Sequence, residues 1–229
     1  MKRKAIIISI KSFKLSNKEK KLFSHKKPWG LILFKRNIQS LNQIKNLITV
    51  VRKVTKDPKF PIMIDEEGKT VSRLSEIINN DFSQKFFGDL YRVNPKNSLF
   101  LYRIYINNLS NILKNIGINI NTVPVLDVLR KNTNKIIGIR SFSNRVHIVK
   151  KLGNFCVNEY SSNKIGTIIK HIPGHGYASL DSHLKLPRVK LTYKNLNKIE
   201  FEPFKSNTST FAMTANVLYE NIDNNNVAT

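Results

Sequence analysis

The residues best suited to chemistry lie in one stretch, KHIPGHGYASLDSHLKLP, which runs from Lys170 to Pro187. It holds three of the chain's five histidines, and its glycines and prolines argue against a helix or a regular strand. Asp181 and His183 are two positions apart, so in an extended loop their side chains point the same way. A carboxylate that accepts a hydrogen bond from an imidazole stabilises the protonated ring, which can then give and take a proton near neutral pH. The pair is therefore a candidate acid/base.

A metal site is the competing interpretation of the same stretch, because imidazole and carboxylate groups are common metal ligands. Its ligands would be His171, His175, Asp181 and His183. The first two are four residues apart, but Pro173 and Gly174 separate them, so they do not share a helical face. The helical HExxH arrangement is also absent. We expect no metal and no other cofactor.

The composition predicts a folded domain with an apolar core. The chain has 229 residues, of which 41% are apolar, enough for one large domain. There are 39 Lys and Arg against 15 Asp and Glu, and the resulting net charge of +24 is typical of nucleic-acid-binding proteins. The lysines are spread along the whole chain, however, and no aromatic-interleaved RNA-binding pattern is present. We favour a compositional bias and expect no nucleic-acid partner.

Two further features bear on where the protein works. The one cysteine, Cys156, allows no disulfide framework, which fits a reducing compartment. The apolar run from Ala5 to Ile10 is too short for a signal peptide, and no stretch reaches the length of a membrane span. We interpret this run as a first buried strand, and we expect a cytoplasmic protein without membrane contact.

Short apolar segments alternate with helical patterns about six times, which indicates a parallel sheet built from βα units. Strands are predicted at 5–10, 30–34, 61–64, 120–128, 165–170 and 211–219, and the main helices at 16–23, 40–54, 99–116, 146–160 and 192–205. Polar residues follow several of these strands, as on the active-site face of a (β/α)₈ barrel. A barrel is the predicted fold. A doubly wound sheet is the alternative, although the chain has no glycine-rich nucleotide-binding loop.

The pattern resembles the family 3 glycoside hydrolases. The Lys170–Pro187 stretch is similar to that family's signature, and further similar segments follow in the family's order: GLILFKRNI (30–38), IMIDEEGKTVSRL (62–74), PVLDV (124–128), IIGIRSFS (136–143) and MTANVLY (213–219). The similarity is greatest to the bacterial β-N-acetylhexosaminidases that recycle peptidoglycan in the cytoplasm. It implies an α/β fold of the (β/α)₈ type over residues 1–229. It also implies retaining hydrolysis of terminal β-linked N-acetylglucosamine, with a carbohydrate as the partner.

The resemblance also implies roles for individual residues. The sugar-binding positions fall on Asp65, Arg73, Arg140, Lys170 and His171. A carboxylate can accept hydrogen bonds from sugar hydroxyls, while Arg and Lys donate to them. The acid/base falls on His183, supported by Asp181.

The chain departs from the family's pattern in three places. Gly68, Lys69 and Thr70 stand where two glycines and an arginine are usual, and Ile139 stands where an acidic residue is common. The family's nucleophilic aspartate follows the next barrel strand, and the sequence ends at Thr229 without it. We therefore expect an incomplete barrel of about six βα units that lacks its C-terminal part and its nucleophile. The alternatives to an active hydrolase are a non-catalytic protein that still binds sugar and a basic nucleic-acid-binding protein.

Overall fold

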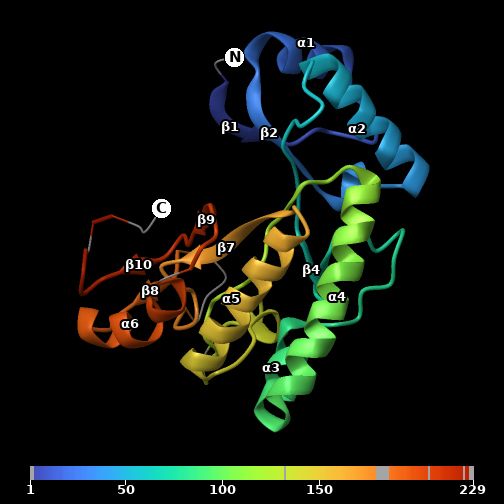
Figure 1. Cartoon of the computed structure of the whole chain (residues 1–229). Coiled ribbons are helices and arrows are strands. Elements are labelled where there is room, and N and C mark those ends of the chain that lie inside the picture. Colours follow the sequence, from blue (N-terminus) through green and yellow to red (C-terminus); the bar gives the residue numbers. More distant parts are fainter. Residues whose placement is uncertain (1–2, 132, 179–185, 206, 224, 227–229) are drawn as a thin grey trace.

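The computed structural model describes residues 3–131, 133–178, 186–205, 207–223 and 225–226. Its main sheet consists of parallel strands whose order across the sheet is also their order along the chain (Figure 1). The strands are β1 (Lys4–Ile8), β2 (Pro28–Leu33), β3 (Ile62–Ile64), β6 (Ile120–Asn121), β7 (Gly166–Ile172) and β9 (Phe211–Thr214). Successive βα units produce this arrangement. The prediction of an incomplete (β/α)₈-type barrel is confirmed. The alternative prediction, a doubly wound sheet, is rejected by this strand order.

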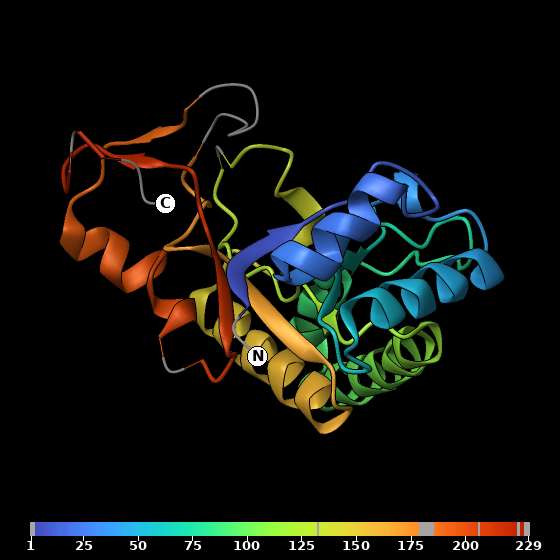
Figure 2. The ribbon, with the colours of Figure 1, turned by 90° about the horizontal axis from the view of Figure 1, so that it is seen from above.

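The helices begin and end where local signals favour it. They are α1 (Asn17–Lys26), α2 (Leu41–Thr55), α3 (Gln84–Val93), α4 (Pro95–Ile116), α5 (Val146–Ser162) and α6 (Tyr193–Ile199). Ser16 and Glu19 form a capping box at the start of α1. Gly117 ends α4 in the left-handed conformation, with φ of 100°. The long helices α2, α4 and α5 lie together on one side of the sheet (Figure 2).

The alternation of side chains along β3 shows that the sheet has two different faces. Ile62 and Ile64 belong to the large apolar core that the strands share with the long helices. Met63 points the other way and packs with Ile120 and Ile168 in a small cluster. Because successive strand residues face opposite sides, this cluster marks the inner face of the barrel.

Three predictions about strands are wrong. The strand expected at 120–128 is limited to β6, which ends at Asn121. The first strand is not buried, since Lys4 to Ile7 are all exposed: β1 is an outer strand of the described sheet. The 211–219 segment is not one buried strand. It contains β9, which is half exposed as the other outer strand, and β10 (Leu218–Tyr219), which pairs with β8 (Arg188–Val189) in a separate small sheet.

Two predictions about helices also need correction. The 192–205 helix is shorter than expected, because α6 ends at Ile199 and a 3₁₀ turn, η3 (Glu202–Phe204), follows. Pro203 lacks a backbone N–H and would clash with the preceding turn of a continued helix. Helix α3 was not predicted from the sequence, although Ser83 caps its first turn.

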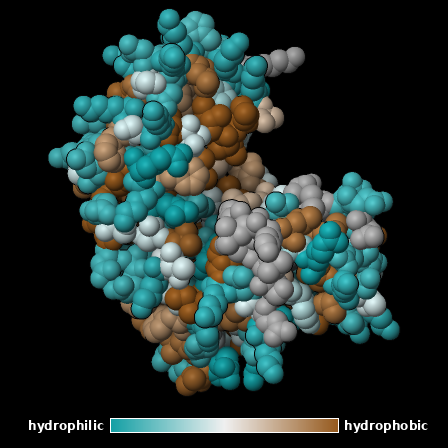
Figure 3. All heavy atoms as spheres, turned by 180° about the vertical axis from the view of Figure 1, so that it is seen from behind, coloured by the Kyte–Doolittle hydropathy of each residue, from teal (hydrophilic) through white to brown (hydrophobic). Residues whose placement is uncertain are grey.

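The space-filling view from behind shows a hollow between the N-terminal and the C-terminal parts of the molecule (Figure 3). Apolar surface lines parts of this hollow, as expected for a curved sheet whose outer strands are exposed. Among the described helices, none is both long and apolar enough to cross a membrane.

Candidate active site

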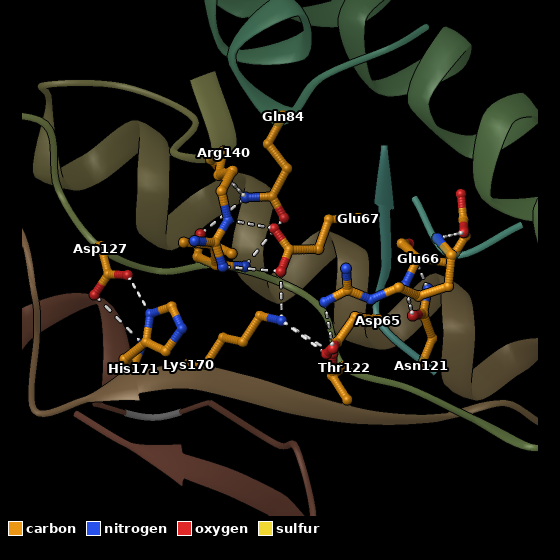
Figure 4. A network of polar contacts seen from close by, with 12 residues as sticks. Asp65, Glu66, Glu67, Gln84, Asn121, Thr122, Asp127, Arg140, Lys170 and His171 are labelled. Carbon is orange, nitrogen blue, oxygen red and sulfur yellow. Dashed lines mark hydrogen bonds and ion pairs between the residues drawn. The ribbon is translucent and has the colours of Figure 1, made fainter. Parts of the chain in front are cut away.

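Acidic and basic side chains converge where β3, β6 and β7 end (Figure 4). The Nζ of Lys170 on β7 lies 2.5 Å from Oε1 of Glu67 and 3.4 Å from Oδ1 of Asp65. It also donates to the hydroxyl of Thr122 at 2.9 Å, and this hydroxyl donates to Asp65. Only 2% of Lys170 is exposed, so these oxygens take the place of water around its ammonium group.

The carboxylates of Asp65 and Glu67 stay ionised because cations surround them. Burial alone would raise the pKa of Asp65, but Lys170 and Arg73 help to hold that pKa below its ordinary value. Burial would likewise raise the pKa of Glu67, and Lys170 and Arg140 outweigh it. The network is therefore a set of buried ion pairs that depend on one another, and removal of one member leaves an uncompensated charge.

Arg140 closes the network on the side of Glu67. Its Nε and Nη2 donate to the two oxygens of Glu67 at 2.7 and 2.9 Å, a bidentate pair. A 3₁₀ turn, η2 (Gly138–Arg140), carries this arginine, and only 11% of its side chain is exposed. The side-chain amide of Gln84 on α3 donates to its carbonyl at 2.6 Å. The position of Arg140 thus depends on helix α3.

A small antiparallel hairpin, β4 (Glu66–Gly68) and β5 (Val71–Ser72), brings Arg73 to the rim of the site. Its Nη2 lies 3.1 Å from Oδ2 of Asp65, and 30% of its side chain is exposed. The buried carboxylate of Glu66 accepts the backbone N–H of Arg73 at 2.8 Å and so fixes the base of that side chain. Gly68 has φ of +129°, and a Cβ there would lie 2.0 Å from the carbonyl oxygen of Phe82. The hairpin therefore requires glycine at this position.

A histidine pair lies beside the network. The Nδ1 of His171 lies 2.7 Å from Oδ2 of Asp127, whose Oδ1 accepts the backbone N–H of His175 at 2.7 Å. Burial would raise the pKa of Asp127, but the imidazole of His171 outweighs it and holds the pKa low. Burial lowers the pKa of His175, and its Nδ1 has no hydrogen-bond partner among the described residues. Asp127 thus orients the ring of His171, whereas Nδ1 of His175 is available for a further hydrogen bond.

A cavity of about 220 Å³ adjoins these groups. Arg140, His171 and His175 line one part of it, and Thr214 and Asn216 line another. Apolar side chains such as Met213 complete the wall, so the cavity combines hydrogen-bonding groups with apolar surface. This combination suits a small polar ligand that also has C–H faces, such as a sugar ring.

The structure brings all five expected sugar-binding residues to one place. Four of them form the network with Glu67, and His171 lies next to them on β7 (Figure 4). The expected acid/base pair, Asp181 and His183, lies outside the described residues. Two of the ligands considered for a metal therefore lie there as well. Among the residues that the structure describes, no group of three or more His, Cys, Asp and Glu could hold a metal ion.

Several residues of the site had no role assigned from the sequence. Glu67 is the clearest, and a signal for it existed: it is two positions after Asp65, so in an extended segment both side chains point the same way. Thr122 and Gln84 carried no such signal. They reach Lys170 and the backbone of Arg140 only through tertiary packing.

The chain is similar over nearly its whole length to known proteins. A family model described as "Glycosyl hydrolase family 3 N terminal domain" matches residues 2–229. A protein named Beta-hexosaminidase A from Pseudoalteromonas piscicida is 32% identical in an alignment of 208 residues that covers 86% of this chain. The alignment covers 34% of that relative, so the chain spans about one third of its length.

Solved structures share the fold. The crystal structure of native NagZ from Neisseria gonorrhoeae matches with a TM-score of 0.89 and 26% identity, covering 96% of this chain and 65% of that one. The structure of the same protein in complex with N-trifluoroacetyl-D-glucosamine matches with a TM-score of 0.88 and 26% identity, covering 96% and 66%. The chain thus spans less than two thirds of the length of that NagZ chain.

Proposed function

The chain belongs to glycosyl hydrolase family 3, since the model of that family's N-terminal domain matches residues 2–229, and we propose that it binds terminal non-reducing β-linked N-acetylglucosamine and takes part in its hydrolysis. The observation that carries the proposal is the buried network in which Lys170 lies between Asp65 and Glu67, at the edge of a polar cavity.

The chemistry of the network supports sugar binding. Asp65 can accept hydrogen bonds from sugar hydroxyls, and Arg73 and Lys170 can donate to them. Hydrogen bonds to charged groups are stronger than those between neutral groups, and here the charged groups are held in place before a ligand arrives. The complex of NagZ from N. gonorrhoeae with an N-acylated glucosamine supports this class of ligand.

We assign the acid/base role to His183, supported by Asp181. The protonated imidazole gives its proton to the leaving glycosidic oxygen as the bond to the anomeric carbon breaks. The neutral imidazole then takes a proton from the water that attacks the same carbon. The carboxylate of Asp181 stabilises the imidazolium form between these steps.

The retaining route also needs a carboxylate that forms the glycosyl-enzyme intermediate. Among the described residues of the site, Asp65 and Glu67 pair with Lys170, and Asp127 pairs with His171. We assign the nucleophilic role to none of these acids. We therefore expect residues 1–229 alone to bind the sugar without turning it over, so a sugar-binding protein remains the second candidate.

We further propose peptidoglycan fragments as the substrate and the cytoplasm as the compartment. The resemblance to cytoplasmic β-N-acetylhexosaminidases of peptidoglycan recycling supports both. The buried, unpaired thiol of Cys156 is compatible with a reducing compartment.

The test uses a version of the chain that also carries the family's C-terminal part, with 4-nitrophenyl N-acetyl-β-glucosaminide as the substrate. Proton NMR follows the configuration of the first sugar released. We expect retained configuration, loss of turnover in His183→Ala and no effect of a chelator. His147→Ala is the control, because His147 is exposed on α5. Unchanged turnover in His183→Ala would reject the acid/base assignment. A rate lost to the chelator and restored by zinc would favour the metal alternative.

A further inference from the structure

Two buried carboxylates hold neighbouring peptide groups of the loop that follows β7. The backbone N–H of His175 donates to Asp127 at 2.7 Å, and that of Gly176 donates to Oε2 of Glu200 at 2.8 Å. Asp127 is fully buried, and only 1% of Glu200 is exposed. Asp127 also orients the ring of His171 through its Nδ1. Glu200 has no part in the sugar-binding network, so its burial against this loop calls for a separate explanation.

Glu200 comes from the end of α6, where its backbone N–H bonds the carbonyl of Leu196. The loop packs directly on its side chain. A Cβ on Gly174 would lie 2.7 Å from Oε2 of Glu200, and a Cβ on Gly176 would lie 2.8 Å from Oε1 and 2.1 Å from the carbonyl oxygen of Val128. The two glycines therefore allow the loop to approach the carboxyl group this closely.

Other contacts fix the same loop from different sides. The hydroxyl of Tyr219 donates to the carbonyl of Gly174, and the hydroxyl of Thr133 donates to the carbonyl of Gly176 at 2.5 Å. The loop thus keeps a fixed course up to residue 178. The residues that follow, 179–185, include the assigned acid/base pair.

The charge of Glu200 is poorly compensated. The Nε of Arg130 lies 4.0 Å from its Oε1, too far for a hydrogen bond. Burial and the nearby charge of Asp127 raise the pKa of Glu200 to about 8. A buried acid whose cation lies no nearer than Arg130 is costly to ionise and contributes little to stability. Such perturbed acids are found disproportionately at functional sites.

We propose that Glu200 is a positioning residue of the hydrolase: it accepts the backbone N–H groups of Gly176 and Tyr177 and so fixes the loop that leads into the assigned acid/base pair. The effect on that pair rests on the proposed function. The anchoring does not depend on the proposed function, because it consists of the hydrogen bond from Gly176 to Glu200. In this proposal Glu200 acts through the loop and does not touch the substrate.

Amide hydrogen exchange tests the anchoring without any need for turnover. Glu200→Asp shortens the side chain and withdraws the acceptor from Gly176, whereas Glu200→Gln keeps an acceptor oxygen. At about pH 7 we expect exchange at Gly176 and Tyr177 to rise at least about tenfold in Glu200→Asp, as for a lost buried hydrogen bond, and by less than about twofold in Glu200→Gln.

The matched control is Glu202→Gln, which removes a half-exposed partner of Lys150 two residues away. It should leave exchange at Gly176 and Tyr177 unchanged. Full protection of these amides in Glu200→Asp would overturn the proposal. An equal rise in Glu202→Gln would also overturn it, because the effect would then not depend on the anchoring bond.

The effect on the reaction is tested with two substrates that differ in leaving group. A phenyl glycoside needs protonation of its leaving oxygen far more than a 2,4-dinitrophenyl glycoside does. In Glu200→Asp we expect kcat/KM, which reports the departure of the leaving oxygen, to fall at least about tenfold with the first substrate and by less than about threefold with the second. Equal falls with both would contradict a positioning role. Both substrates are tested on a version of the chain that also carries the family's C-terminal part. No turnover by its unsubstituted form would count against the proposed function, and the exchange result would still decide the anchoring.

Discussion

Lys170 and Glu67 form an ion pair in the interior of the site, with Nζ 2.5 Å from Oε1 and only 2% and 3% of the side chains exposed. The two residues belong to β7 and to the hairpin that follows β3, on either side of β6 in the sheet. The pair therefore ties together the ends of strands that are not neighbours. Because both charges are out of water, each depends on the other and on Arg140 and Asp65.

Lys170→Met should destabilise the fold by roughly 3–5 kcal/mol, because it leaves the buried carboxylate of Glu67 without its nearest cation. Urea unfolding measures the change. Lys150→Met is the control: this lysine pairs with Glu202, both side chains are 33% exposed, and about 0–1 kcal/mol is expected. The double variant Lys170→Met, Glu67→Gln should recover part of the loss. Equal costs for the two lysines would contradict the account.

Glu200→Gln should stabilise the fold increasingly as the pH rises. Burial raises the pKa of Glu200 in the folded chain to about 8, from an ordinary value of 4.5. The unfolded chain therefore ionises this group first. Its contribution to stability is full below about pH 4.5 and is lost as the pH rises through about 8. Glutamine does not titrate, so the variant should gain roughly 2–4 kcal/mol relative to the wild type between about pH 5 and pH 8.

Urea unfolding at the two pH values checks this prediction. Glu202→Gln serves as the control, because Lys150 and Lys205 lower the pKa of that half-exposed carboxylate. It should show no gain with rising pH. A stability difference for Glu200→Gln that is the same at both pH values would mean that the carboxyl group is not held neutral by burial.

Gly68→Ala should cost several times more stability than Gly138→Ala. Both glycines have positive φ, +129° and +37°, but a Cβ at Gly68 would meet the carbonyl oxygen of Phe82 at 2.0 Å, whereas nothing lies within 4 Å of one at Gly138. We expect roughly 2–4 kcal/mol for the first and about 1 kcal/mol for the second. Thermal unfolding measures both. Because Gly68 shapes the hairpin that carries Arg73, the first variant should also weaken sugar binding, and similar values for the two variants would argue against this role.

The outer strands of the described sheet should promote self-association of residues 1–229. On β1, Ile6 and Ile7 are 51% and 44% exposed, and unpaired strand edges readily pair with other chains. Ile7→Lys should shift the species seen by analytical ultracentrifugation toward the monomer. Leu22→Lys, at a residue 41% exposed on α1, should not. A monomeric unsubstituted chain at all concentrations would contradict the prediction.

Much of the fold was predictable because it depends on local patterns. Apolar segments that alternate with amphipathic ones predicted the parallel sheet, and the family resemblance implied the sugar-binding roles of Asp65 and Lys170. The exposure of β1 was not predictable, since the same apolar run suits a buried strand and an outer one. The edge or interior position of a strand is decided only when the whole sheet forms.

The rest of the site could not be predicted because it depends on contacts between residues that are far apart in the sequence. Glu67 acquires its role through Arg140, which is 73 residues away in the sequence. Glu200 was interpreted only as part of a helix, and its contact with Gly176 exists because α6 ends against the loop after β7. Neither relationship has a fixed spacing that a sequence pattern could reveal.

The proposed sugar site is tested most directly by calorimetric titration of residues 1–229 with N-acetylglucosamine. Asp65→Ala and Arg140→Ala should each weaken binding by roughly 1–3 kcal/mol, as for a lost charged hydrogen bond. Arg103→Ala is the control, because the side chain of Arg103 is 55% exposed and pairs with Glu159. Circular dichroism shows whether each variant is folded. We predict binding of the sugar but not of short duplex DNA, and weaker sugar binding only in the two site variants. Unchanged affinity in both folded site variants would contradict the account.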